Sequence, residues 1–212
     1  MKNIQAFIFD LDGVLTDTAE YHFQAWKRLA EEESVLFTRQ DNEQLRGISR
    51  RASLELILKG RRLSEEKMQE LMDRKNKYYL EYIKAISEKD LLPAATDLLD
   101  ELKARQFKLA LASGSKNAPE VISRLGIASF FDVIAHGGSV EKTKPAPDIF
   151  LHAAKKLEAA PRFCVVVEDA EAGIDAAKSA GMFTIGIGPP ERVGAADFIY
   201  PTVADINIED II

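Results

Sequence analysis

Short, continuously apolar segments recur along this chain and constrain its fold more than any other feature. They lie at residues 4–9, 108–112, 132–135, 163–167, 184–187 and 198–200. Strands covered by helices on both faces of a parallel sheet give continuous apolar runs rather than an alternation of polar and apolar residues. Amphipathic helical patterns separate most of these segments, and one of them begins at Asn117, which is expected to cap that helix. The alternation predicts an α/β fold, a Rossmann-like parallel sheet with helices on both faces.

One long stretch, from about residue 16 to residue 88, shows helical periodicity and no convincing strand. Asp17 and Glu20 have the spacing of a helix capping box, and apolar residues follow at helical intervals. Because the strands resume afterwards, we expect an inserted α-helical cap domain at 16–88 and a core made of 1–15 and 89–212. The charged runs at 31–33, 61–62 and 65–67 are expected on solvated helix faces.

Composition excludes several classes of protein. A content of 46% hydrophobic and 29% charged residues is typical of a globular protein. The formal net charge of −6 argues against nucleic acid or an anionic membrane as a partner, because clustered Lys and Arg hold both. No apolar run reaches the length of a membrane span, and the single cysteine, Cys164, favours inert packing in a reducing compartment. We therefore expect a soluble, cytoplasmic protein.

Polar residues that could carry chemistry follow several of the predicted strands or precede a predicted helix. They are Asp10, Asp12, Ser113, Gly114, Lys144, Glu168 and Asp169. Ligands of an open parallel sheet bind where the strands end, so we expect these residues along one edge. Taken singly, each has a plainer explanation as a helix cap, a turn former or a solvated lysine. Together they do not, because clustered carboxylates without a cation would repel one another.

A magnesium ion would resolve that repulsion, because Mg²⁺ takes hard oxygen ligands from a few carboxylates and from substrate phosphate. The constellation predicts a Mg²⁺-assisted phosphoryl-transfer site. Asp10 continues a buried strand and is the predicted nucleophile, and Asp12, past the turn, is the predicted general acid/base. Lys144, Ser113 and Gly114 would orient the phosphoryl group. The predicted metal ligands are Asp10, Asp12, Glu168 and Asp169.

The segments that carry these residues resemble the motifs of a known family. They read FDLDGVL at 9–15, ASGS at 112–115, KPAPD at 144–148 and EDAEAGI at 168–174. In order, spacing and strand context they resemble the four motifs of the haloacid dehalogenase-like phosphotransferases. The resemblance covers nearly the whole chain. It implies a Rossmann-like core, Mg²⁺, an aspartyl phosphate on Asp10 and a helical cap inserted after the first motif.

The predicted cap is similar to that of one subgroup, the β-phosphoglucomutases, which interconvert β-glucose 1-phosphate and glucose 6-phosphate through β-glucose 1,6-bisphosphate. The similarity lies at 16–23, 42–50, 74–76 and 113–119, and at Trp26. The substrate-binding residues that it implies are Thr18, His22, Trp26, Arg46, Gly47, Arg50, Ser53 and Lys75. In that subgroup's pattern, Arg50 grips the phosphate that is not being transferred.

Three functions stay open at this stage. The first is a mutase acting on a small phosphorylated sugar, and the second is a sugar-phosphate phosphatase of the same family. Both need Asp10, Asp12 and the metal, so residues of the cap such as Arg50 and His22 must separate them. A non-catalytic phosphate-binding protein is the third, and the intact pair of aspartates argues against it. We expect a monomer, because no long apolar surface stripe is left over.

Overall fold

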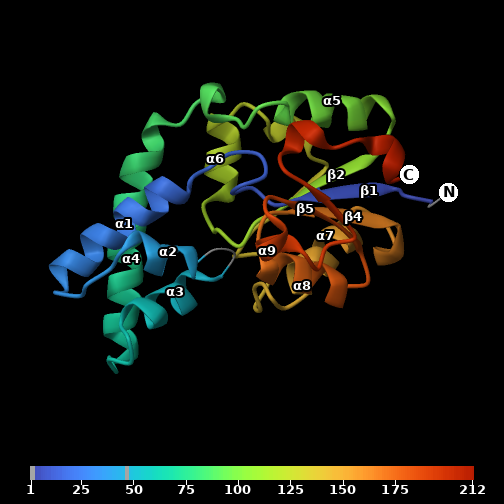
Figure 1. Cartoon of the computed structure of the whole chain (residues 1–212). Helices are drawn as coiled ribbons and strands as arrows, with labels where there is room; N and C mark the ends of the chain where they lie inside the picture. The colour runs from blue at the N-terminus through green and yellow to red at the C-terminus, as the bar shows by residue number, and fades with distance from the viewer. Residues whose placement is uncertain (1–2, 46–47) are drawn as a thin grey trace.

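The computed structural model describes residues 3–45 and 48–212. Within these ranges an α/β part and a helical part lie side by side (Figure 1). The described strands are β1 (Ala6–Phe9), β2 (Lys108–Ala112), β3 (Val133–Ala135), β4 (Cys164–Glu168), β5 (Phe183–Ile187) and β6 (Phe198–Tyr200). They form one parallel sheet in the order β3-β2-β1-β4-β5-β6. The prediction of a parallel α/β fold is confirmed.

Helices cover both faces of this sheet. They are α5 (Ala95–Ala104), α6 (Ala118–Arg124), α7 (Asp148–Lys156), α8 (Glu171–Ser179) and the short α9 (Pro190–Val193). Phe7 and Phe9 of β1 pack in one apolar cluster with α5 and α6, whereas Ala6 and Ile8 pack in a second cluster with α7 and α8. Alternate side chains of a strand point to opposite faces. Since both faces of β1 are buried, the strand contains no polar residue.

The helical part lies between β1 and α5 in the sequence. Its helices are α1 (Ala19–Glu32), α2 (Arg39–Glu43), α3 (Arg50–Ile57) and α4 (Glu65–Tyr82). Trp26, Leu54 and Leu71, from α1, α3 and α4, belong to a small apolar core separate from the two clusters of the sheet. An isolated bridge pairs Thr16 with Leu91, so the two connections to the α/β part run together there. The described residues of this segment form helices and no strand, as the periodicity predicts.

The predicted capping box at the start of α1 is wrong. The helix begins at Ala19, and Thr18, the residue before it, makes no side-chain cap hydrogen bond. Asp17 accepts a hydrogen bond from the backbone N–H of Ala19 instead. Glu20 turns away to pair with Arg39 of α2, with 2.6 Å between Nη1 and Oε2. A carboxylate that can reach a guanidinium forms the stronger, charge-assisted hydrogen bond there.

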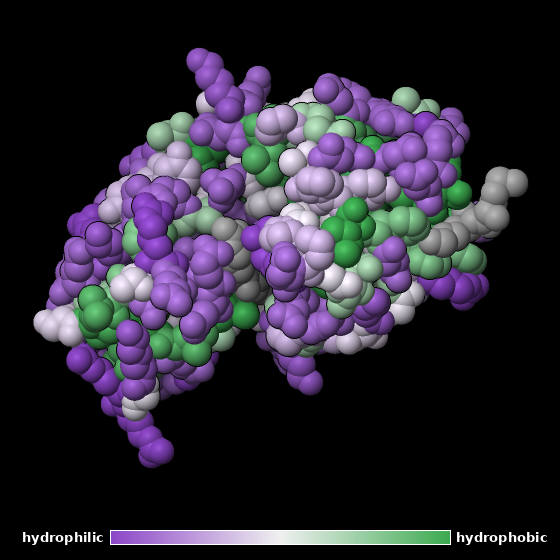
Figure 2. All heavy atoms as spheres, viewed as in Figure 1, coloured by the Kyte–Doolittle hydropathy of each residue, from purple (hydrophilic) through white to green (hydrophobic). Residues whose placement is uncertain are grey.

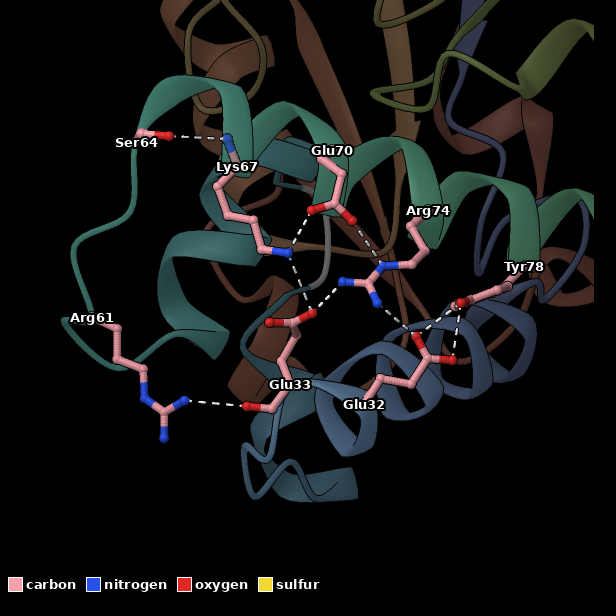
Figure 3. Close-up of polar contacts among 8 residues, drawn as sticks. All are labelled: Glu32, Glu33, Arg61, Ser64, Lys67, Glu70, Arg74 and Tyr78. Atoms are coloured by element: carbon pink, nitrogen blue, oxygen red, sulfur yellow. Dashed lines mark hydrogen bonds and ion pairs between the residues drawn. The ribbon is translucent and has the colours of Figure 1, made fainter.

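Charged residues at the end of α1 face α4 rather than solvent alone (Figure 3). Arg74 contacts both Glu32 and Glu33, and the hydroxyl of Tyr78 donates to Glu32 at 2.8–2.9 Å. Lys67 lies 3.8 Å from Glu33. Most of these side chains keep substantial exposure, as expected of solvated faces. They also join α1 to α4, which a helical pattern in one segment does not reveal.

The surface seen in Figure 2 is mainly hydrophilic over both parts, with small apolar areas between the charged side chains. In residues 3–45 and 48–212, no helix combines the length and the apolar character needed to cross a membrane.

Candidate active site

A cavity of about 500 Å³ lies between the helical part and the carboxyl ends of the strands. Its lining includes ten of the predicted site residues, namely Asp10, Asp12, His22, Trp26, Arg50, Ser53, Lys75, Ser113, Gly114 and Asp169. Lys144 and Glu168 lie behind this lining, in contact with Asp10 or with each other. Arg46 and Gly47 lie outside the described residues. The fold therefore gathers at one place groups that are far apart in the sequence.

Asp10 is held at the floor of the cavity by the sheet itself. Its backbone N–H donates to the carbonyl of Val167 at 2.9 Å, which extends the pairing of β1 with β4 by one residue. One carboxylate oxygen accepts the backbone N–H of Asp12 at 3.0 Å, and the other accepts the ammonium of Lys144 at 2.6 Å. The side chain thus has a fixed orientation, as a nucleophile requires.

Lys144 bridges two buried carboxylates. Its Nζ lies 2.6 Å from Asp10 and 2.6 Å from Glu168, and all three side chains are almost fully buried. Burial alone would lower the pKa of Lys144, but the charges of Asp10 and Glu168 overcome this effect and raise it. Burial, together with the neighbouring charge of Asp10, raises the pKa of Glu168 to about 8. One ammonium therefore does not fully compensate the carboxylates around it.

The same corner of the cavity has the donor set of a hard cation. Asp10, Glu168 and Asp169 each offer a carboxylate oxygen, and these oxygens lie within 4.8 Å of one another. All three side chains are buried, which makes their mutual repulsion costly without further positive charge. Mg²⁺ prefers such oxygens and leaves positions for water and phosphate. The residues present fit a magnesium ion. Asp12, also predicted as a ligand, is not part of this group.

Gly13 lets the chain turn between these carboxylates. Its φ of +81° lies in the left-handed region, and a Cβ on it would overlap the carboxylate of Asp169. A glycine is needed here because any other residue would meet both the strain and the overlap. Close approach of the turn to Asp169 therefore depends on the glycine of the first motif.

Asp12 is oriented by Thr18, which the sequence analysis placed among the substrate-binding residues. Thr18 is fully buried and is not among the residues that line the cavity. Its hydroxyl and its backbone N–H both donate to Oδ1 of Asp12, and the hydroxyl of Tyr79 donates to Thr18 in turn. Burial and then the charge of Asp10 raise the pKa of Asp12 to about 6, although the bonds from Thr18 oppose this. Such a carboxyl can both give and take a proton near neutral pH.

A second buried cluster lines the opposite wall, on α1 and α4. Lys75 Nζ lies 2.7 Å from Nδ1 of His22 and 4.8 Å from the ring centres of both Trp26 and Tyr79. Burial, followed by the charge of Arg50, lowers the pKa of Lys75 well below its usual value. Burial, then Lys75 and Arg50, does the same to the pKa of His22. Burial and mutual repulsion therefore disfavour positive charge on Lys75 and His22, and an anionic ligand would offset this effect.

Arg50 and Ser53 lie on α3 and line the cavity. Arg50 Nη2 donates to the side-chain oxygen of Asn76 at 2.8 Å, and the hydroxyl of Ser53 donates to the carbonyl of Ser49 at 3.0 Å. Burial lowers the pKa of Arg50 below its usual value. The guanidinium therefore faces the cavity as a partly desolvated cation.

Sequence reasoning assigned no catalytic or ligand-binding role to several residues that the structure brings to this site. Ser115 and Lys116 line the cavity, and the side chains of Asn76 and Asn117 join its two sides. Lys116 is the most informative of them, because it adds a cation beside the phosphate-binding loop predicted at Ser113 and Gly114. Its position just after the strand-end motif is the signal that could have singled it out.

Comparison with known proteins identifies the family. A family model for haloacid dehalogenase-like hydrolases matches residues 4–181. The chain belongs to this family. Its members that are most relevant here include the beta-phosphoglucomutase of Bacillus subtilis, 47% identical over 210 residues, which cover 97% of this chain and 93% of that protein. The phosphorylated carbohydrates phosphatase of Thermotoga maritima is 32% identical over 215 residues, covering 99% and 97% of the two chains.

Among solved structures, the beta-phosphoglucomutase of Clostridium difficile matches with a TM-score of 0.95 at 43% identity. The match covers 98% of this chain and 95% of that one. The family resemblance drawn from the four motifs is confirmed. The similarity also extends through the helical part, because a match of this extent includes residues on both sides of the cavity.

Proposed function

We propose that this protein is a Mg²⁺-dependent β-phosphoglucomutase. One observation carries the proposal: a single cavity has Asp10 and Asp12 on its floor and Arg50, a partly buried cation, on its opposite wall. A substrate with a phosphate at each end would meet the reacting aspartates with one and the guanidinium with the other. A guanidinium suits this because it forks onto phosphate oxygens. The 47% identity to a beta-phosphoglucomutase supports this reading.

In the proposed reaction, Asp10 attacks the phosphorus of the bisphosphate. A bond forms between its carboxylate oxygen and phosphorus, the bond from phosphorus to the sugar oxygen breaks, and Asp12 gives its proton to that oxygen. The monophosphate leaves and β-glucose 1-phosphate takes its place; Asp12 removes the proton of its 6-hydroxyl, which attacks the phosphorus held by Asp10, so the bond from Asp10 to phosphorus breaks and the bisphosphate forms. After this bisphosphate turns round, Asp10 takes the phosphoryl group from the 1-position, Asp12 gives its proton to that oxygen, and glucose 6-phosphate is released. Lys144 and Ser113 hold the phosphoryl oxygens. Asp10, Glu168 and Asp169 would hold Mg²⁺, which supplies positive charge to the phosphoryl group.

The helical segment at 16–88 acts in this proposal as a cap. It brings Arg50, Lys75 and His22 over the aspartates and excludes water, which would otherwise hydrolyse the aspartyl phosphate. The protein is further proposed to act as a monomer in the cytoplasm on a small phosphorylated sugar.

The rival is a sugar-phosphate phosphatase, favoured by the 32% identity to a phosphorylated carbohydrates phosphatase. The deciding assay supplies β-glucose 1-phosphate, Mg²⁺ and a trace of β-glucose 1,6-bisphosphate, and follows glucose 6-phosphate and free phosphate together. A mutase yields glucose 6-phosphate well in excess of free phosphate. Rapid release of phosphate with little glucose 6-phosphate would assign the protein to the phosphatases.

Replacing Arg50 with alanine is expected to lower kcat/KM for the bisphosphate by about 10- to 100-fold, the range of a lost charge-assisted hydrogen bond. Phosphorylation of Asp10 by acetyl phosphate, which has no second phosphate, should change little. Steady-state kinetics with the bisphosphate and with acetyl phosphate measures how far the loss differs between the two phosphoryl donors. Arg62→Ala serves as the control, because Arg62 is exposed and does not line the cavity. Equal losses with both donors would contradict the role of Arg50.

Replacing Thr18 with valine is expected to move the acidic limb of the pH profile of kcat/KM upward by about one pH unit. The substitution keeps the shape of the side chain but removes the hydroxyl that stabilises ionised Asp12, so the pKa of Asp12 rises above about 6. A general base must be ionised to act, so activity is then lost at a higher pH on acidification. Thr202→Val, at an exposed turn far along the chain, should leave the limb in place. If the acidic limb of the pH profile stays in place while kcat falls, Thr18 acts only by packing.

A further inference from the structure

The side-chain oxygen of Asn76 accepts two hydrogen bonds from opposite sides of the cavity. Arg50 Nη2 donates at 2.8 Å and Asn117 Nδ2 donates at 2.8 Å. Asn76 lies on α4 and Arg50 at the start of α3, both in the helical part, whereas Asn117 precedes α6 in the α/β part. A carbonyl oxygen has two acceptor positions, so this oxygen is fully used. One amide therefore joins two helices of the helical part to the strand-end loop of the sheet.

Asn117 gives independent support for this contact. An asparagine just before a helix is expected to cap it with its side chain, and the sequence pattern predicts that role. In the structure, Asn117 makes no such cap bond and its side chain reaches Asn76 instead. Its own backbone N–H donates to the hydroxyl of Ser115 at 3.2 Å, which fixes the loop. The side chain of Asn117 therefore bonds to Asn76 in the helical part rather than to the backbone of its own helix.

The charge around Arg50 explains why a neutral acceptor stands at position 76. Among residues 3–45 and 48–212, no carboxylate lies within ion-pair distance of Arg50. The amide orients the guanidinium without neutralising it. A carboxylate in its place would pair with Arg50 and compete with an arriving phosphate.

We propose that Asn76 is a positioning residue that holds Arg50 toward the cavity and, through Asn117, ties the helical part to the α/β part. The inference rests on the proposed function in one respect, namely that Arg50 binds a phosphate of the substrate. The tie between the two parts does not depend on that function. Loss of Asn76 leaves Arg50 free to adopt other rotamers and removes the link to Asn117 at the same time.

The first experiment measures the tie without any ligand. Leu36→Cys on the helical part and Lys155→Cys on α7 are both exposed positions for a pair of spin labels. Pulsed distance measurements are compared for the labelled protein with and without Asn76→Ala, Asn117→Ala or both. Each single variant should increase the population with long label separation about 5-fold or more, and the double variant should add little, because both changes remove the same bond. Additive effects, or distances unchanged in both single variants, would overturn the tie.

The second experiment separates positioning from mere packing by comparing Asn76→Ala with Asn76→Asp. Aspartate keeps an oxygen for Asn117, so the label distances should stay as in the parent protein, yet its charge should weaken binding of the bisphosphate by about 10-fold or more. Alanine should weaken binding and also lengthen the distances. Phosphorylation of Asp10 by acetyl phosphate should change less than 2-fold in either variant. Equal behaviour of the two variants in both measurements would overturn the assignment.

The two experiments also keep the failure of this inference distinct from failure of the proposed function. If the parent protein releases phosphate instead of forming glucose 6-phosphate, the mutase assignment fails while the label distances still test the tie. Thermal unfolding of each variant is measured first, and Asn117→Ala tests the same bond from the α/β side if Asn76→Ala unfolds. Parent-like distances in a folded Asn117→Ala variant would overturn the tie.

Discussion

Asp10→Asn is expected to reduce turnover by at least about 10⁴-fold, the scale of losing a covalent nucleophile. The amide keeps the size of the side chain, but it lacks the charge and the nucleophilic oxygen that bond formation with phosphorus requires. Lys144 still has Glu168 as a partner at 2.6 Å, so the variant should remain folded. Steady-state kinetics and intact-protein mass spectrometry after incubation with acetyl phosphate measure the loss of turnover and of bound phosphate.

Asp12→Asn provides the matched comparison for that variant. Acetate is a good leaving group and needs no proton, so Asp12→Asn should still be phosphorylated by acetyl phosphate. Transfer to a sugar hydroxyl should fail, because no group then removes the proton. Asp100→Asn, at an exposed position of α5, controls for the effect of replacing an aspartate by asparagine away from the cavity. Phosphorylation that persists in Asp10→Asn would disprove the assignment of the nucleophile.

Lys144→Met is expected to destabilise the protein by about 3–5 kcal/mol at neutral pH in the absence of divalent ions, because it leaves Asp10 and Glu168 buried without their cation. For a chain of this size the midpoint of thermal unfolding would fall by roughly 6–20 °C. Methionine fills a similar volume, so the loss reports charge rather than a cavity. Thermal and urea unfolding with a chelator present measure it, and Lys155→Met on the exposed side of α7 is the control.

The same variant should show a pH dependence of defined sign. A carboxyl whose pKa is higher in the folded than in the unfolded state weakens folding at high pH, and the penalty disappears as the pH falls toward the unfolded value. The pKa of Glu168 is already raised to about 8 with Lys144 present, and it rises further without the ammonium. Below about pH 8 Glu168 is protonated in both proteins, so the part of the deficit that depends on its charge should be largest above pH 8 and shrink as the pH falls toward 8. Added Mg²⁺ should also restore part of the stability, since it replaces the missing charge. A deficit that grows on acidification would contradict this account.

The positions of the strands could be predicted from the sequence because they depend on local composition. Each described strand begins and ends within two residues of its predicted range. The edge at which Asp10, Ser113 and Asp169 meet followed from topology, since the carboxyl ends of parallel strands face the same way. The helical nature of the segment after β1 was readable from its periodicity. The bounds of the cap and the roles of its residues remain predictions.

The hydrogen-bond and ion-pair partners of polar side chains could not be predicted from the sequence in this way. Thr18 was placed in the substrate pocket and lies behind Asp12, and Glu20 was placed in a cap and pairs with Arg39. Asn117 was placed in a cap and reaches Asn76. In each case two partners compete for a polar side chain, one nearby in the sequence and one distant, and the distant or buried partner forms the hydrogen bond. That choice depends on the burial and charge at the meeting point, which a pattern within one segment does not contain.

By itself, then, the sequence determined the alternation of strands and helices, the helical character of the segment after β1 and the meeting of Asp10, Ser113 and Asp169 at one edge of the sheet. These follow from periodicity and chain direction, which are properties of single segments. Only the tertiary structure decided that Lys144 bridges Asp10 and Glu168, that Thr18 orients Asp12, and that an asparagine links the two walls of the cavity. Such contacts join segments far apart in the chain, and their free energies depend on the desolvation that folding creates.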